Sequence, residues 1–127
     1  MKKDITNESD VEQLVYGFYT LLRKDDEVGH FFNEVIEIDW DHHMPRICNF
    51  WSSILLGTNT YKDNAMKKHL ELSQISKIED HHVDRWMYLW VRSIDERFEG
   101  SIAEMAKDRA SQIGELMKFK LKGSSLL

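Results

Sequence analysis

Apolar residues recur every three or four positions through most of the chain, which is the spacing of amphipathic helices with one buried face. The first row contains Val11, Leu14, Val15, Phe18, Tyr19 and Leu22. A second row contains Ile78, Val83, Trp86, Trp90, Ile94 and Phe98, and a third contains Ile102, Met105, Ala106, Ile113, Leu116, Met117 and Leu121. The sequence has no alternating β-pattern of useful length, so the pattern predicts an all-α protein.

Signals for helix starts and stops accompany these three rows. Each is preceded by a Ser-x-x-Glu pair, the signature of a capping box. The pairs are Ser9 with Glu12, Ser76 with Glu79, and Ser101 with Glu104. We expect Gly100 to end the second of these helices and Gly123 to end the third.

A fourth helix is expected from about Asp41 to Leu56, with Gly57 as its stop. Its inward row is His43, Ile47, Phe50 and Ile54. Pro45 lacks an N–H and disfavours helix in the residue before it, so the helix should start close to Pro45. His43 would then lie on a weakly held helix end.

The stretch between Gly57 and Ser76 carries only a short helical pattern, from Ala65 to Leu72, and His69 lies within it. Packing alone explains such a short helix in a long connection poorly, and connections often carry function.

The bulk properties fit one domain over residues 1–127, with a short flexible tail from about residue 123. The net charge is −5 and no basic cluster appears, which argues against nucleic acid as a partner. No apolar run approaches the roughly 20 residues of a membrane span, and no secretory signal opens the chain. The lone Cys48 fits a reducing compartment and is expected to be a small packed residue. We therefore expect a cytoplasmic protein.

Six histidines raise the question of a metal site. They are His30, His42, His43, His69, His81 and His82. The spacings of a zinc site, HExxH or His-x-x-x-His, are absent, and a di-iron site would need a second Glu-x-x-His copy beside the one from Glu79 to His82. Both kinds of site are disfavoured.

Three polar side chains point into the expected aromatic core from three separate helices: Tyr19, His43 and Trp86. Taken singly, each could be a core or boundary residue whose polar atom finds an ordinary partner. Taken together, they are typical of a pocket that holds a polar ligand.

Several motifs, in this order, resemble the truncated haemoglobins over about residues 5 to 120. They are Phe18-Tyr19, Arg23-Lys24-Asp25, Gly29, Phe31-Phe32, Trp40, His43, Met44-Pro45-Arg46, Asn49-Phe50-Trp51, Leu55-Leu56-Gly57, Tyr61, Met66-Lys67-Lys68-His69-Leu70, His82, Asp84-Arg85-Trp86, Asp95-Glu96 and Phe98. The other groups usually carry Gly-Gly pairs, which this sequence lacks. The combination of Trp86 with His43 favours group III.

The resemblance implies a truncated globin fold, a 2-over-2 helical sandwich around haem b. It implies that His69 is the proximal ligand of a pentacoordinate iron, and that Tyr19 and Trp86 are distal residues that donate hydrogen bonds to a bound gas. His43 would lie at the pocket mouth, either as a gate or as a sixth iron ligand. Among the cofactor-binding residues, Ile47 and Phe50 would wall the distal side and Phe32 would pack against the porphyrin. Trp51 is assigned to packing on the back edge of its helix.

These roles imply tight, slowly released O2, with NO and CO as further ligands. Slow release suits gas detoxification or low-oxygen chemistry rather than bulk oxygen transport. One alternative is a haem-based redox enzyme, peroxidase-like or a nitric oxide dioxygenase, which would need a separate reductase because the chain has no flavin or nicotinamide domain. Another is a haem-free helical regulatory module. A monomer or weak dimer is expected.

Overall fold

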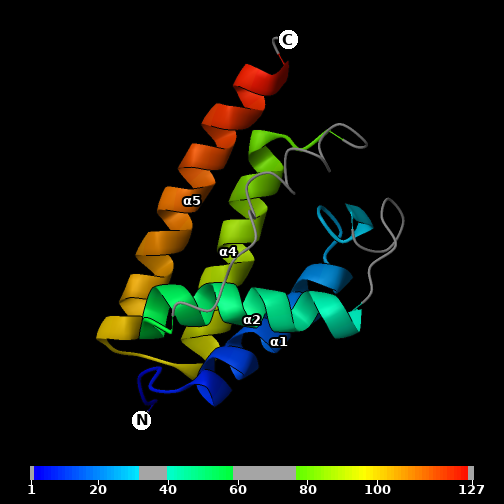
Figure 1. The fold of residues 1–127 in the computed structure, drawn as a ribbon. Coiled ribbons are helices and arrows are strands. Elements are labelled where there is room, and N and C mark those ends of the chain that lie inside the picture. Colours follow the sequence, from blue (N-terminus) through cyan, green and yellow to red (C-terminus); the bar gives the residue numbers. More distant parts are fainter. Residues whose placement is uncertain (1, 32–39, 59–76, 126–127) are drawn as a thin grey trace.

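The computed structural model describes residues 2–31, 40–58 and 77–125. Its helices are α1 (Glu8–Lys24), α2 (Trp40–Leu56), α4 (Asp80–Arg97) and α5 (Ser101–Ser125). Helices α1 and α2 pack on each other, α4 and α5 lie side by side, and α1 joins the two pairs through α4 (Figure 1). Within the described ranges, an isolated bridge between Lys3 and Phe98 is the sole β-type pairing. The predicted all-α, 2-over-2 arrangement is confirmed.

Three aromatic rings from three helices meet at the centre of the core. Trp90 of α4 is fully buried, stacks on Trp51 of α2 at 4.4 Å and 24°, and meets the edge of Phe18 of α1 at 5.0 Å. Trp51 is only 3% exposed, so it is a central core residue and not the back-edge residue that the sequence predicted.

The buried face of α2 is shifted by about one position from the predicted row. Met44, Cys48, Trp51 and Leu55 are its buried apolar residues. The predicted row of His43, Ile47, Phe50 and Ile54 is half-buried beside it. Both rows have the same 4, 3, 4 spacing, so periodicity alone could not tell which one faces the helices.

Two helix starts differ from the predicted capping boxes. Helix α1 begins at Glu8, and the side chain of Asn7 accepts the Asp10 N–H at 2.9 Å. Asn7 therefore takes the capping position expected for Ser9. Helix α4 begins at Asp80, where Nδ1 of His82 accepts the Glu79 N–H at 2.9 Å. Ser76, predicted to cap that helix, lies outside the described residues.

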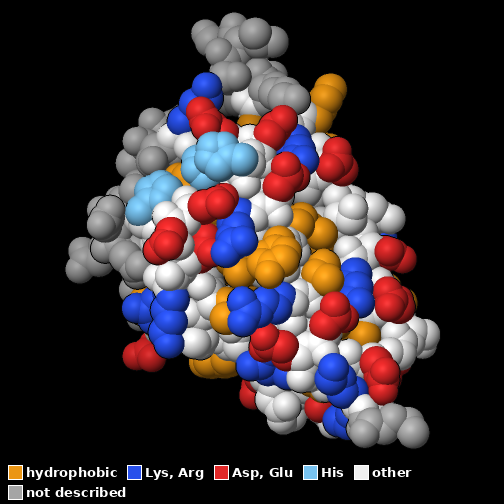
Figure 2. Space-filling model, turned by 180° about the vertical axis from the view of Figure 1, so that it is seen from behind, with side chains coloured by type: hydrophobic (Ala, Val, Ile, Leu, Met, Phe, Trp, Pro, Cys, Tyr) orange, Lys and Arg blue, Asp and Glu red, His pale blue; other side chains and the backbone are white. Residues whose placement is uncertain are grey.

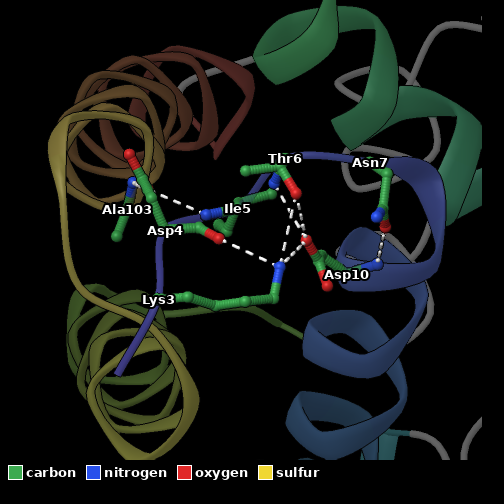
Figure 3. Close-up of polar contacts among 7 residues, drawn as sticks. All are labelled: Lys3, Asp4, Ile5, Thr6, Asn7, Asp10 and Ala103. Atoms are coloured by element: carbon green, nitrogen blue, oxygen red, sulfur yellow. Dashed lines mark hydrogen bonds and ion pairs between the residues drawn. The ribbon is translucent and has the colours of Figure 1, made fainter. Parts of the chain in front are cut away.

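The start of α5 is capped from the far end of the sequence (Figure 3). The carboxylate of Asp4 accepts the N–H groups of Ile102 and Ala103, each at 2.9 Å. The chain makes room for it at Gly100, whose φ is +136° and where a Cβ would come within 2.5 Å of the Asp4 side chain. A distant carboxylate thus occupies the place predicted for the Ser101–Glu104 box, because it reaches the unpaired N–H groups directly.

Asp4→Ala is expected to lower the free energy of unfolding by about 1–2 kcal/mol, the usual cost of a lost cap. Burial raises the pKa of Asp4, but the N–H groups of Ile102, Ala103 and Ile5 lower it by more, so it lies below its ordinary value. The carboxylate therefore contributes its stability above the ordinary pKa and loses it as the pH falls through the lowered one. Urea unfolding at pH 7 should separate the variant from the wild type, and the difference should shrink below about pH 4. Asp108→Ala, an exposed aspartate of α5, is the control, and an equal loss there would contradict the cap.

The remaining helix boundaries follow the sequence in part. Helix α2 spans the predicted range to within one residue and ends before Gly57, whose φ of +70° suits a glycine. Pro45 lies inside the helix, so the prediction of a start close to Pro45 is wrong. Helix α5 continues past Gly123 to Ser125, because glycine in a last turn costs only about 1 kcal/mol.

Leu116, predicted to be buried, is 48% exposed.

The face shown in Figure 2 carries basic and acidic side chains interspersed around a small apolar patch. The large apolar side chains exposed in the described part of the chain are Tyr16, Tyr88, Leu116 and Phe119. Among the described helices, none combines the length and the apolar character that a membrane crossing requires.

Candidate functional site

The structure brings two of the three predicted polar side chains into direct contact. The hydroxyl of Tyr19 on α1 lies 3.1 Å from Nε2 of His43 on α2, within hydrogen-bonding distance. Their rings meet edge to face at 5.3 Å. The contact crosses the interface between α1 and α2, so it depends on the packing of the whole pair.

Trp40 completes this contact and was not among the predicted site residues. Its ring meets the edge of Tyr19 at 5.8 Å and of His43 at 5.6 Å. The Arg23 guanidinium stands over the Trp40 ring at 4.3 Å, a cation–π distance. The spacing of Trp40 and His43, three residues apart at a helix start, is the sequence signal that could have placed Trp40 here.

Trp86, the third predicted polar residue, approaches the same region from α4. Phe18 lies between the two distal candidates, with its ring 5.4 Å from Tyr19 and 5.8 Å from Trp86, both edge to face. The side chain of Trp86 is half-buried. Tyr19, His43 and Trp86 therefore border one aromatic region on three helices.

The Tyr19 hydroxyl stays protonated, because burial raises its pKa well above the ordinary value. It has one proton to give. If the neutral imidazole of His43 carries its proton on Nε2, it donates to the Tyr19 oxygen and leaves the phenolic proton free for another acceptor. If Nε2 is unprotonated, it accepts that proton instead. The His43 tautomer thus decides whether the Tyr19 hydroxyl donates its proton to His43 or to another acceptor.

Cys48 lies on the buried row of α2, near the same helix pair. Burial raises the pKa of its thiol to about 11, so the thiol is protonated at neutral pH. A buried, protonated thiol fits the predicted packing role of Cys48 and is not a reactive nucleophile.

The predicted wall of the pocket is partly described. Ile47 and Phe50 are half-buried and pack against the main core. His69 and Phe32, the predicted iron ligand and porphyrin contact, both lie outside the described residues. What is described suits haem by its chemistry: hydrogen-bonding groups at Tyr19 and Trp86, beside apolar side chains that a flat porphyrin could contact.

An open surface pocket of about 410 Å³ is lined in part by Tyr19 and Trp40. Its walls are Tyr16, Tyr19, Thr20, Arg23, Lys24, Trp40 and Met44. It was not predicted from the sequence, because its walls come from both α1 and the start of α2 and exist only once the two helices pack. Tyr19 lines both this pocket and the contact with His43.

No family model matches the chain. It is 29% identical over 116 residues to the "Group 3 truncated hemoglobin ctb" of Campylobacter jejuni subsp. jejuni, and the match covers 89% of each chain. A crystal structure of the group III truncated hemoglobin from Campylobacter jejuni superposes with a TM-score of 0.82 at 27% identity, over 95% of each chain.

Proposed function

We propose that this chain, a member of the truncated haemoglobin family most similar to group III, binds haem b with His69 as the proximal ligand and holds a diatomic ligand near Tyr19 and Trp86. Haem iron supplies the position at which O2, NO or CO binds. The observation that carries the proposal is the Tyr19–His43 contact across the α1–α2 interface, with Trp86 brought to the same aromatic region by Phe18.

The distal residues have separate tasks in this proposal. Tyr19 offers its phenolic O–H and Trp86 its indole N–H to the ligand. His43 contacts the Tyr19 oxygen, and in its Nε2–H tautomer it would donate to that oxygen, so that the phenolic proton could go to the ligand. Ile47 and Phe50 keep bulk water away, which strengthens each remaining hydrogen bond.

His43 also sits in the first turn of α2, ahead of Pro45, whose missing N–H leaves that turn short of one hydrogen bond. A loosely held first turn suits a side chain that swings between an inner position on Tyr19 and an outer one. This supports the role of His43 as a gate over its role as a sixth iron ligand.

Slow ligand release follows from two donors, so we propose gas detoxification or chemistry at low oxygen, in the cytoplasm, with the chain as a monomer or weak dimer. A redox enzyme, peroxidase-like or a nitric oxide dioxygenase, would use the same residues together with a separate reductase. Turnover assays with and without an electron donor distinguish this candidate from a simple binder.

The absorbance spectrum of protein produced with ample haem tests the proposal. We expect a sharp Soret band in the wild type and its loss or strong shift in His69→Ala, since that substitution removes the proximal ligand. His81→Ala, at an exposed histidine of α4, should keep the band. A colourless wild type would contradict haem binding, and an unchanged spectrum in His69→Ala would contradict the assigned ligand. Two axial nitrogen ligands in the ferric spectrum would contradict the gate.

A further inference from the structure

An ion pair joins the end of α1 to α4, close to the proposed distal donors. Asp25 follows α1 directly, and its side chain is 4% exposed. Nε and Nη2 of Arg85 on α4 donate to Oδ1 of Asp25 at 2.8 and 2.7 Å. Two short charge-assisted bonds from one planar guanidinium fix its direction as well as its distance.

The same carboxylate also shapes the chain after α1. Its second oxygen, Oδ2, accepts the N–H groups of Glu27 and Val28 at 3.0 and 3.2 Å. Burial raises the pKa of Asp25, but Arg85 and these N–H groups lower it by more, so the carboxylate is charged at neutral pH. A charged, largely buried carboxylate with four bonds is a rigid anchor, because each bond restricts it from a different side.

The two partners are close in sequence to the two proposed donors. Arg85 immediately precedes Trp86, and Asp25 lies six residues beyond Tyr19, at the C-cap of the same helix. Neighbours on a helix point about 100° apart, so fixing the direction of Arg85 also fixes the rotation of α4 at Trp86. Phe18, between Tyr19 and Trp86, is the apolar contact that such a rotation would disturb.

We propose that the Asp25–Arg85 ion pair is a positioning device for the distal donors, which sets where the indole N–H of Trp86 lies relative to the Tyr19 hydroxyl. The inference rests on the proposed function, because it presumes that both groups face the same ligand. The geometry of such donors is demanding, since a hydrogen bond weakens steeply with misalignment.

The chain offers a matched control in the residue before Arg85. Asp84 pairs with Lys118 of α5 at 2.5 Å, but the Asp84 side chain is 64% exposed. Asp84→Asn therefore removes an ion pair from the same turn of α4 without touching α1. The Lys118 side chain is 19% exposed, but the carboxylate that Asp84→Asn changes lies in solvent, where an ion pair contributes little to stability.

The test compares Asp25→Asn, Arg85→Gln and Arg85→Lys with Asp84→Asn in the haem-loaded protein. We expect O2 dissociation to become about threefold to tenfold faster in Asp25→Asn and Arg85→Gln, the equivalent of weakening one hydrogen bond. The C–O stretching band of the CO form should shift or broaden in both, and the Trp86 indole N–H signal should move in NMR spectra. Arg85→Lys should restore part of each change, and Asp84→Asn should change none.

A second background separates positioning from general stability. In Trp86→Phe protein, Arg85→Gln should add no further increase in the O2 dissociation rate, since its effect passes through Trp86. A full additional increase would overturn the inference, as would variants that lower the melting temperature while the C–O band and the indole signal stay in place. If Arg85→Gln does not fold, Asp25→Asn and Arg85→Lys decide on the same readouts. Absence of a Soret band in the wild type is a different result, which contradicts the proposed function itself.

Discussion

Tyr19→Phe and Trp86→Phe are each expected to speed O2 dissociation by about tenfold to a hundredfold. Tyr19→Phe removes only the hydroxyl, and Trp86→Phe removes the indole N–H while keeping a smaller aromatic ring at the position. A hydrogen bond to a partly charged acceptor contributes about 1.5–3 kcal/mol, and 1.4 kcal/mol corresponds to a factor of ten. Tyr19 contacts His43 and Phe18, and Trp86 contacts Phe18, and the proposed donor roles rest on these contacts.

The double variant should release O2 faster than either single variant, although the two effects need not add, because the two groups share one ligand. CO gains less negative charge than O2 on binding, so its dissociation should change less. Stopped-flow mixing of the O2 form with excess CO gives the rates. Tyr16→Phe is the control, since Tyr16 lies one turn earlier on α1 and is 53% exposed. Unchanged rates in both single variants would contradict the donor roles.

Trp90→Ala is expected to lower the free energy of unfolding by about 3–5 kcal/mol, the usual cost of deleting a large buried aromatic side chain. Trp90 stacks on Trp51, meets Phe18 edge to face, and donates its indole N–H to the Ala106 carbonyl at 3.1 Å. Deleting it leaves a cavity between three helices, and 5 kcal/mol is comparable to the whole stability of many small domains.

The measurement is urea unfolding followed by circular dichroism, on proteins with matched haem content, since bound haem would itself add stability. Phe119→Ala is the matched control: it deletes a large aromatic side chain from α5, but one that is 76% exposed. We expect that control to stay within about 0.5 kcal/mol of the wild type. A loss of less than 1 kcal/mol in Trp90→Ala would show that the core does not depend on this ring.

The fold was largely predictable, because amphipathic helices show in the sequence as apolar residues spaced three or four positions apart. The predicted row that starts at Val11 lies on the buried face of α1, and the predicted row that contains Trp90 lies on the buried face of α4. On α2 the prediction chose the neighbouring row, since two rows of equal spacing run along that helix and only the position of α1 and α4 decides between them. Within the site, Tyr19 and His43 were predicted to point from separate helices into one core, and their direct contact is a result of helix packing.

What could not be predicted rests on partners far apart in the sequence. The cap of α5 is an example, since a Ser-x-x-Glu pattern is visible locally while Asp4 stands 98 residues before Ile102. Arg85 and Asp25, 60 residues apart, are another example. In both pairs the tertiary fold brings a carboxylate to a hydrogen-bond donor. Neither contact produces a regular spacing of residues that could be recognised in the sequence.

The bridge from Lys3 and Asp4 to residues 98–103 also bears on how the chain folds during synthesis. A ribosome makes Lys3 and Asp4 well before it makes their partners at residues 98–103. Until then, Asp4 has no helix start to bind, and the buried Ile5 beside it has no finished core to enter. These contacts therefore form only after residues 98–103 have been made, so a protease or a chaperone that acts on the growing chain meets residues 3–5 before those contacts exist.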